Sequence, residues 1–440
     1  MSFVKDSVRT AVVRVSILGI NIFAAIVHAR WLGPEGVGIL ALFALIQNIS
    51  FRFGNLGFGS GFSYFMAKQQ ATAKELTRFS WVISLTMTLL SCILLALFWK
   101  TKWSPWRELP PAIFYLGFIT IPLFYLKNYF QRILSGQLRI KVVNVSEIIS
   151  AICYIPLMSV LVIFLSWGIM GAVIANIAAQ TIVMLYLNWC LKKSSAQETG
   201  SGAFAAGIPL IKAIWNYGRW SYLIFFLNFF QEQLPLMILT YFYPAAVVGF
   251  FSMGRNLMMR TQLLPQSFAQ VLFPFTAAAE AQEATKRTNT LCRHFLIFMG
   301  AGVVVLGVVA QPIIVLLFGE AFLPAVTVLY ALLPAILLYP LTQFLPVHVA
   351  AFGNPRIVFI RNLIATPACL LFCLLLVPPF GAIGAALSLS AMYALLALLN
   401  LFIYLKSTGS NFSDVVVPNY NDWLYYKKLY KAKIMGFAVH

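Results

Sequence analysis

Charged residues are scarce in this sequence, and acidic residues are the scarcest of them. Only 10% of the 440 residues are Asp, Glu, Lys or Arg, whereas a typical soluble domain has about 25%. Hydrophobic residues make up 61% of the chain, and the mean hydropathy is +0.86. This composition excludes an ordinary soluble fold and indicates a polytopic membrane protein.

The sequence also lacks the motifs of several enzyme classes. It has no P-loop, nucleophile elbow or histidine-rich metal motif, so it gives no support for ATP hydrolysis or covalent catalysis. Its six cysteines lie in or beside apolar stretches without metal-ligand spacing. We therefore expect no catalytic residue, no bound metal and no cofactor.

The net charge of +19, from 31 Lys and Arg against 12 Asp and Glu, does not indicate nucleic-acid binding, because the basic residues gather in every second loop. These loops and ends contain Lys5, Arg9, Lys68, Lys74, Arg78, Arg139, Lys141, Lys192, Lys193, Lys212, Lys286, Arg287, Arg293, Arg356, Lys406, Lys427, Lys428, Lys431 and Lys433. The opposite loops contain Arg30, Lys100, Lys102 and Arg107 alone. The positive-inside rule then predicts that both termini are cytoplasmic.

Apolar runs predict about twelve membrane-spanning helices. Their approximate bounds are 8–31, 36–58, 79–99, 110–134, 143–165, 167–191, 215–240, 245–275, 292–317, 322–350, 357–378 and 381–405. We expect the first run to remain as a helix, because it is too long for a signal peptide and lacks a small-residue cleavage site.

Similar turn motifs recur in the two halves of the chain at a nearly constant offset. The matched segments are 34–38 with 244–249, 136–140 with 353–357, and 168–172 with 381–385. Such repeats predict two pseudo-symmetric six-helix lobes of the same orientation. We place an N-terminal lobe at 1–207, a C-terminal lobe at 208–406 and a basic, aromatic tail at 407–440. Within this tail, 422–435 forms either an amphipathic helix on the membrane surface or a solvated, frayed end.

Polar residues form a stripe on the first span. Ser7, Arg14, Asn21 and His28 recur every seven positions, so they drift by only about 20° per step around a helix. An arginine near mid-bilayer costs about 2.5–3.5 kcal/mol on insertion scales and normally faces a bundle interior or a watery cavity. The stripe therefore predicts an inward-facing polar surface.

Similar stripes occur on three more spans. The second span carries Asn48, Arg52 and Asn55; the seventh carries Arg219, Asn228, Gln231 and Glu232; the eighth carries Ser252, Arg255, Asn256, Met259, Gln262, Gln266 and Gln270. We expect these surfaces to meet in a cationic cavity where the lobes meet. The alternative is that the arginines only pack between helices.

Glu232 is the one acidic residue well inside a span. It either binds a coupling proton or cation or forms a static ion pair with Arg255, Arg14 or Arg52. His28, Arg219 and Arg260 are weaker candidates for the same surface. Arg132 and Arg361, near predicted span ends, are expected to snorkel and to have structural roles.

Four segments carry a resemblance to a known family. They are ARWLGPEGVGILAL at 29–42, FGNLGFGSGF at 53–62, LFGEAFLPAVTVL at 317–329 and GAIGAALSLS at 381–390. They resemble the bacterial polysaccharide exporter family, which includes O-antigen flippases of the multidrug/oligosaccharidyl-lipid/polysaccharide (MOP) superfamily. The chain departs from the common family pattern at 231–233, where Gln-Glu-Gln replaces an acid-then-base pair.

The resemblance implies a MATE-like fold of twelve helices and alternating access through a cavity lined by helices one, two, seven and eight. It also implies an inner-membrane flippase that moves an undecaprenyl-diphosphate-linked oligosaccharide to the periplasmic leaflet. Among these residues, Arg14, Arg52 and Arg255 suit the diphosphate, whereas Asn256, Gln262 and Gln266 on the eighth span suit sugar hydroxyls. Asn21 and Asn48 are further candidates for substrate binding. The expected partners are this lipid-linked glycan and membrane lipids, with a polysaccharide polymerase, a chain-length regulator and coupling protons or sodium as further candidates.

Two other functions stay open. A drug or organic-cation antiporter of the same superfamily would need acidic cavity residues, and here arginines outnumber them. An integral-membrane glycosyltransferase or ligase would need catalytic groups on a large outer loop, and the predicted outer loops are short.

Overall fold

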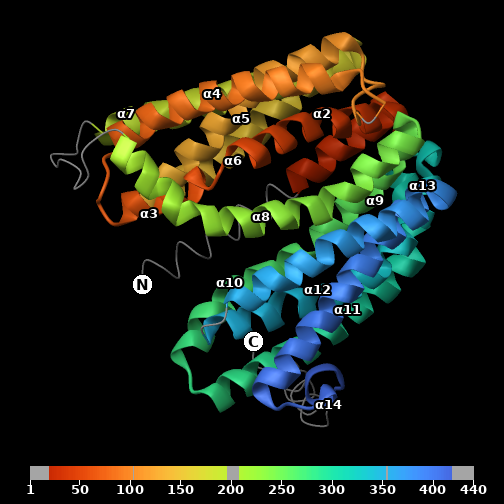
Figure 1. The fold of residues 1–440 in the computed structure, drawn as a ribbon. Coiled ribbons are helices and arrows are strands. Elements are labelled where there is room, and N and C mark those ends of the chain that lie inside the picture. Colours follow the sequence, from red (N-terminus) through yellow and green to blue (C-terminus); the bar gives the residue numbers. More distant parts are fainter. Residues whose placement is uncertain (1–18, 103, 196–207, 353–354, 419–440) are drawn as a thin grey trace, which may run out of the picture. The chain divides into compact units, whose positions relative to one another are not determined.

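The computed structural model describes residues 19–102, 104–195, 208–352 and 355–418, and within these ranges the chain is helical without strands (Figure 1). The longer helices are α2 (Gly33–Gly54), α3 (Phe58–Ala67), α4 (Ala73–Trp99), α5 (Pro111–Gly136), α6 (Ile140–Ser159), α7 (Gly168–Ser195), α8 (Ile208–Phe242), α9 (Ala245–Thr261), α10 (Leu263–Ala278), α11 (Ala281–Phe318), α12 (Pro324–Ala351) and α13 (Pro355–Thr408). Short elements are η1 (His28–Leu32), η2 (Val160–Phe164), η3 (Glu320–Phe322) and α14 (Phe412–Val416).

Nine helices in the described ranges are long and apolar enough to cross a membrane. The predicted all-α polytopic membrane architecture is therefore confirmed, whereas the number twelve stays a prediction. Two of the nine stretches, Gly19–Gly54 and Ile357–Thr408, each cover two predicted spans. The predicted span 245–275 is divided between α9 and α10, of 17 and 16 residues.

Two glycines interrupt the two helical stretches that each cover two predicted spans. Gly33 has φ 65° and ψ −175°, and Gly381 has φ 56° and ψ −128°; side chains strongly disfavour this backbone region, whereas glycine tolerates it. The turn motif at 34–38 lies inside α2 and is helical. The π-helical turn η1 and Gly33 make the change of helix, and α2 begins at Gly33 itself.

The described chain divides into two compact units. The first contains Met1–Phe230, Leu236–Ser252 and Leu316–Phe322, and the second contains Gln231–Pro235, Met253–Val315 and Leu323–His440. These units group segments by packing, whereas the predicted lobes 1–207 and 208–406 rest on sequence repeats, so the lobe bounds stay a prediction. The amphipathic helix considered for 422–435 lies outside the described residues.

In the first unit, α5 packs against α2, α3, α4 and α7 (Figure 1). Tyr125, Tyr129 and Phe130 of α5 are fully buried. The segment before α5 is fixed by two tryptophans: Trp99 donates through Nε1 to the Trp106 carbonyl at 3.0 Å, and Trp106 donates to the Leu42 carbonyl at 3.0 Å. These bonds satisfy indole groups buried among apolar side chains.

In the second unit, α12 packs against α10 and α13. Tyr404 of α13 is buried and donates to Asn289 Oδ1 of α11 at 2.6 Å. Elsewhere, α4 and α11 leave most of their apolar surface uncovered, since only 17% of the most apolar window of each is buried. Such outward apolar surface is expected where a helix faces lipid.

Candidate functional site

The predicted stripe on the first span is only partly described. Arg14 and Ser7 lie outside the described residues, whereas Asn21 and His28 are half-buried. His28 Nε2 shares a hydrogen bond of 2.7 Å with the hydroxyl of Tyr154, on α6. The imidazole is therefore anchored to a neighbouring helix of the same unit.

Arg52 lies in the last turn of α2 and is half-buried. Its guanidinium carbon lies 5.6 Å from the centre of the Phe229 ring, on α8, in a cation–π arrangement. The two neighbouring polar residues of this stripe form hydrogen bonds with backbone groups four residues away. Asn48 donates to the Ala44 carbonyl at 2.9 Å, and Asn55 Oδ1 accepts from the Gly59 amide at 3.1 Å.

An apolar cavity of about 270 Å³ lies beside Arg52 in the first unit. Its lining includes Phe53, Phe229, Phe230, Leu94, Trp106 and Met237. Phe229 therefore both contacts the Arg52 guanidinium and lines the cavity. A cation and an apolar hollow that share one aromatic ring suit an amphipathic ligand with an anionic group next to hydrocarbon.

In the second unit, Arg255 of α9 donates through Nη1 to Gln233 Oε1 of α8 at 3.3 Å. Glu232 is exposed, and no ion pair within 4.0 Å joins the described residues Glu232 and Arg255. The choice between a coupling role and a static pair for Glu232 stays open.

The other predicted residues of α9 and α10 differ in exposure. Asn256 is exposed, whereas Gln262 is buried at the break between the two helices. Gln262 donates to the Tyr393 hydroxyl at 3.4 Å, and Gln266 donates to the Tyr339 hydroxyl at 2.7 Å. Both amides thus bond to tyrosines of their own unit.

The two remaining weaker candidates are arginines near helix surfaces. Arg219 is exposed and lies 5.8 Å from the centre of the Trp215 ring, four residues earlier on α8. Arg260 is half-buried in the last turn of α9.

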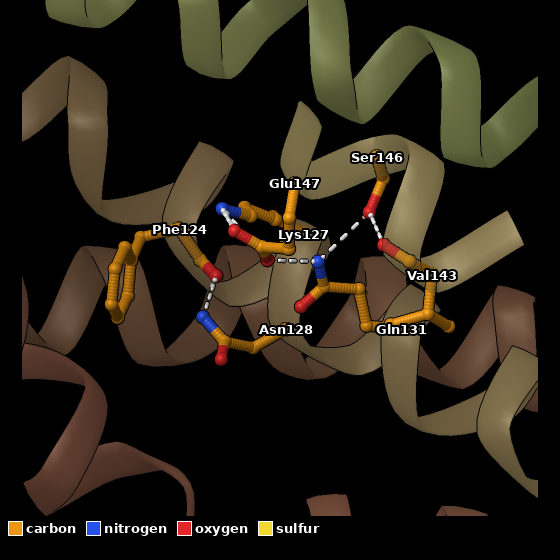
Figure 2. Close-up of polar contacts among 7 residues, drawn as sticks. All are labelled: Phe124, Lys127, Asn128, Gln131, Val143, Ser146 and Glu147. Atoms are coloured by element: carbon orange, nitrogen blue, oxygen red, sulfur yellow. Dashed lines mark hydrogen bonds and ion pairs between the residues drawn. The ribbon is translucent and has the colours of Figure 1, made fainter. Parts of the chain in front are cut away.

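Figure 2 shows a polar cluster between α5 and α6 that the sequence analysis missed. Lys127 Nζ lies 3.3 Å from Glu147 Oε1. Gln131 Nε2 donates to the same oxygen at 2.6 Å and to Ser146 Oγ at 3.0 Å. The side chain of Lys127 is 16% exposed and that of Glu147 is 41% exposed. One signal was available, because Lys127 and Gln131 are four residues apart and so share a helix face.

Comparison with known proteins gives both a family and a fold. Residues 27–327 match the family described as polysaccharide biosynthesis protein. A Shigella flexneri protein, provisionally named O-antigen transporter, is 22% identical over 295 residues, which cover 66% of this chain and 68% of that protein.

Two solved structures have a similar fold. The lipid II flippase MurJ, in an inward closed conformation, has a TM-score of 0.75 at 15% identity, and the match covers 93% of this chain and 89% of MurJ. A multidrug resistance MATE family transporter of the MOP superfamily, in an inward-facing conformation, has a TM-score of 0.68 at 16% identity, covering 91% of this chain and 98% of that one. The chain therefore has the fold of these membrane proteins.

Proposed function

The chain belongs to the polysaccharide biosynthesis protein family, and from that premise we propose that it is a flippase for a lipid-linked oligosaccharide. Its substrate is an undecaprenyl-diphosphate-linked repeat unit of O-antigen or another surface polysaccharide. The protein moves the head group from the cytoplasmic to the periplasmic leaflet of the bacterial inner membrane by alternating access, with both of its termini in the cytoplasm. It acts as a transporter without covalent chemistry on the substrate.

One observation carries this proposal. The Phe229 ring contacts the Arg52 guanidinium and also lines the apolar cavity. A polyprenyl diphosphate has a doubly charged group joined directly to hydrocarbon. Arginine binds phosphate oxygens through paired, charge-assisted hydrogen bonds, and the aromatic cavity accepts the first isoprenyl units. We assign the diphosphate to Arg14, Arg52 and Arg255.

The sugar part of the substrate is assigned to amides. Asn21, Asn48, Asn256, Gln262 and Gln266 supply donors and acceptors for hydroxyl groups. Because Gln262 and Gln266 bond to Tyr393 and Tyr339, the tyrosine hydroxyls belong to the same hydrogen-bonding surface. Glu232 is the candidate for coupling to protons or sodium, and a polysaccharide polymerase and a chain-length regulator are the partners that act next.

Charge reversal tests the proposal. In a strain that depends on this protein for its surface glycan, Arg52→Glu and Arg255→Glu should abolish surface glycan at normal protein levels, because a carboxylate repels the diphosphate. Lipid-linked glycan should then accumulate on the cytoplasmic leaflet. Arg78→Glu is the matched control, since Arg78 is exposed on α4.

Two results would contradict the assignment. Export retained by both reversed variants would show that these arginines do not hold the substrate. Increased drug sensitivity on deletion, without accumulation of lipid-linked glycan, would favour the antiporter instead.

A further inference from the structure

A buried arginine in the second unit has no carboxylate partner among the residues that the structure describes. Arg361, in the first part of α13, is 9% exposed, so it does not snorkel as the sequence analysis expected. It lies six residues from the start of the helix at Pro355, or about 9 Å along its axis. Within the part of the chain that the structure describes, no carboxylate lies within 4.0 Å of its guanidinium.

Two asparagines hold this guanidinium. Arg361 donates through Nη1 to Asn400 Oδ1 at 2.8 Å and through Nη2 to Asn362 Oδ1 at 3.0 Å. Because arginine has donors and no acceptor, both amides must present their oxygen to it. Their Nδ2 groups are then turned elsewhere as donors.

The result is a cluster of buried donors for which the described part of the chain supplies no acceptor. Arg361 Nε, Asn362 Nδ2 and Asn400 Nδ2 are all buried and have no hydrogen-bond partner among the described residues. Asn362 is 0% exposed and Asn400 is 3% exposed. Unpaired buried donors are rare and costly, and here all of them have the same polarity and surround one positive charge.

A small cavity of about 10 Å³ adjoins the cluster. Arg361 and Asn400 line it through carbon atoms, together with aliphatic side chains that include Leu345, Val349 and Ile403, so its accessible wall is apolar and the buried donors lie behind that wall. A volume of roughly 10–15 Å³, measured for the centre of a water-sized sphere, is the least that holds one water, so a halide, which is larger, enters only if the aliphatic side chains move apart. A single water has two lone pairs and no net charge, so it would leave donors unpaired and the guanidinium uncompensated.

We propose that Arg361, Asn362 and Asn400 form a binding site for a small anion. The ligand is a single negatively charged acceptor, either a free halide or one phosphate oxygen of an anionic lipid that reaches in from the nearby end of α13. Such an acceptor takes several N–H donors at once and neutralises the arginine. The site is separate from the residues assigned to the flippase substrate and does not depend on that proposal.

Anion-dependent stability tests the site. The full-length protein, delipidated in a neutral detergent, is unfolded thermally at constant ionic strength while gluconate is replaced by chloride or bromide. In separate samples without halide, phosphatidylglycerol is added, with phosphatidylcholine as the neutral control. The wild-type Tm should rise saturably with halide or with phosphatidylglycerol. Whichever of the two additions raises the Tm identifies the source of the anion.

Two variants control the measurement. Arg361→Gln should raise the half-saturating ligand concentration about tenfold or more, because a hydrogen bond to a charged group is lost. It should also be at least as stable as the wild type without anion, since it removes a buried unpaired charge. Arg132→Gln, an exposed arginine on α5, should keep the wild-type response.

Bromide line broadening in NMR measures binding directly, so the halide arm does not rely on stability alone. Saturable broadening that Arg361→Gln abolishes supports a halide site. The proposal is overturned if neither halide nor phosphatidylglycerol acts saturably on the wild type. It is equally overturned if all three proteins respond alike, because the effect would then be one of bulk salt or detergent.

Discussion

Gly38 and Gly249 lie at equivalent places in one helix crossing, where α2 meets α9. A Cβ atom on Gly38 would lie 1.8 Å from the Ala245 carbonyl oxygen, and one on Gly249 would lie 2.0 Å from the Pro34 carbonyl oxygen. The two glycines are 211 residues apart (249 − 38), and so are Ala245 and Pro34 (245 − 34). The crossing is thus reciprocal, in agreement with the turn repeat seen in the sequence.

Alanine at either glycine should destabilise the protein. Helical Gly→Ala normally gains about 0.5–1 kcal/mol, but here the added methyl group meets backbone, so the helices must separate at a cost of about 1–3 kcal/mol. We expect Gly38→Ala and Gly249→Ala to lower Tm by similar amounts. Gly302→Ala is the control, because nothing lies within 4 Å of its Cβ position, and it should be neutral or stabilising. Unchanged stability in both test variants would contradict the close crossing.

The aromatic ring beside Arg52 should affect transport more than folding. Phe229→Leu keeps an apolar lining but removes the cation–π contact, which is worth about 0.5–2 kcal/mol. We expect glycan export to fall severalfold at normal protein levels. Phe225→Leu, at an exposed ring on the same helix, is the control. Equal export by the two variants would show that the substrate does not pass through the cavity.

The Lys127–Glu147 pair should behave as a coupled unit. Glu147→Gln leaves an ammonium without its carboxylate, and Lys127→Met leaves a carboxylate with Gln131 alone, so each should lower stability by about 1–3 kcal/mol. The double variant removes both charges and should recover part of that loss. A double-mutant cycle on unfolding free energies should give a coupling of about 0.5–3 kcal/mol. Strict additivity would show that the pair contributes nothing.

The N-terminus of α4 depends on a capping box. The Glu75 amide donates to Thr72 Oγ1 at 3.3 Å, and the Thr72 amide donates to Glu75 Oε2 at 3.0 Å. Thr72→Ala should lower the free energy of unfolding by about 0.5–2 kcal/mol, whereas Thr72→Ser should be nearly neutral. Similar losses in the two variants would show that the threonine methyl group, and not the cap, matters.

Membrane class and most helix positions could be predicted from composition and apolar runs, because lipid imposes helices on any spanning segment. The start of α4 at Ala73 was predicted too late, at 79, because the Thr72-x-x-Glu75 signal was not used. The start of α2 at Gly33, directly after the π-helical turn η1, could not be predicted, since a π-helical turn has no recognised sequence pattern.

Individual polar contacts were much less predictable than helices. The stripe on α9 and α10 was expected to face a cavity, yet the amides of Gln262 and Gln266 bond to tyrosines 131 and 73 residues away. Arg361 was expected to reach water because it lies near a helix end. Its two asparagine partners include Asn400, 39 residues later, and such distant pairing has no local signal in the sequence.

The break at Gln262 has a consequence for biogenesis. α9 and α10 have 17 and 16 residues, and each is shorter than the roughly 20 apolar residues that a single crossing of the bilayer requires. The tyrosines that receive the Gln262 and Gln266 amides are in α12 and α13, which the ribosome makes later. We therefore expect integration of this segment into the lipid phase to be completed only after those later helices arrive, so nascent chains truncated before Tyr339 should leave it outside the bilayer.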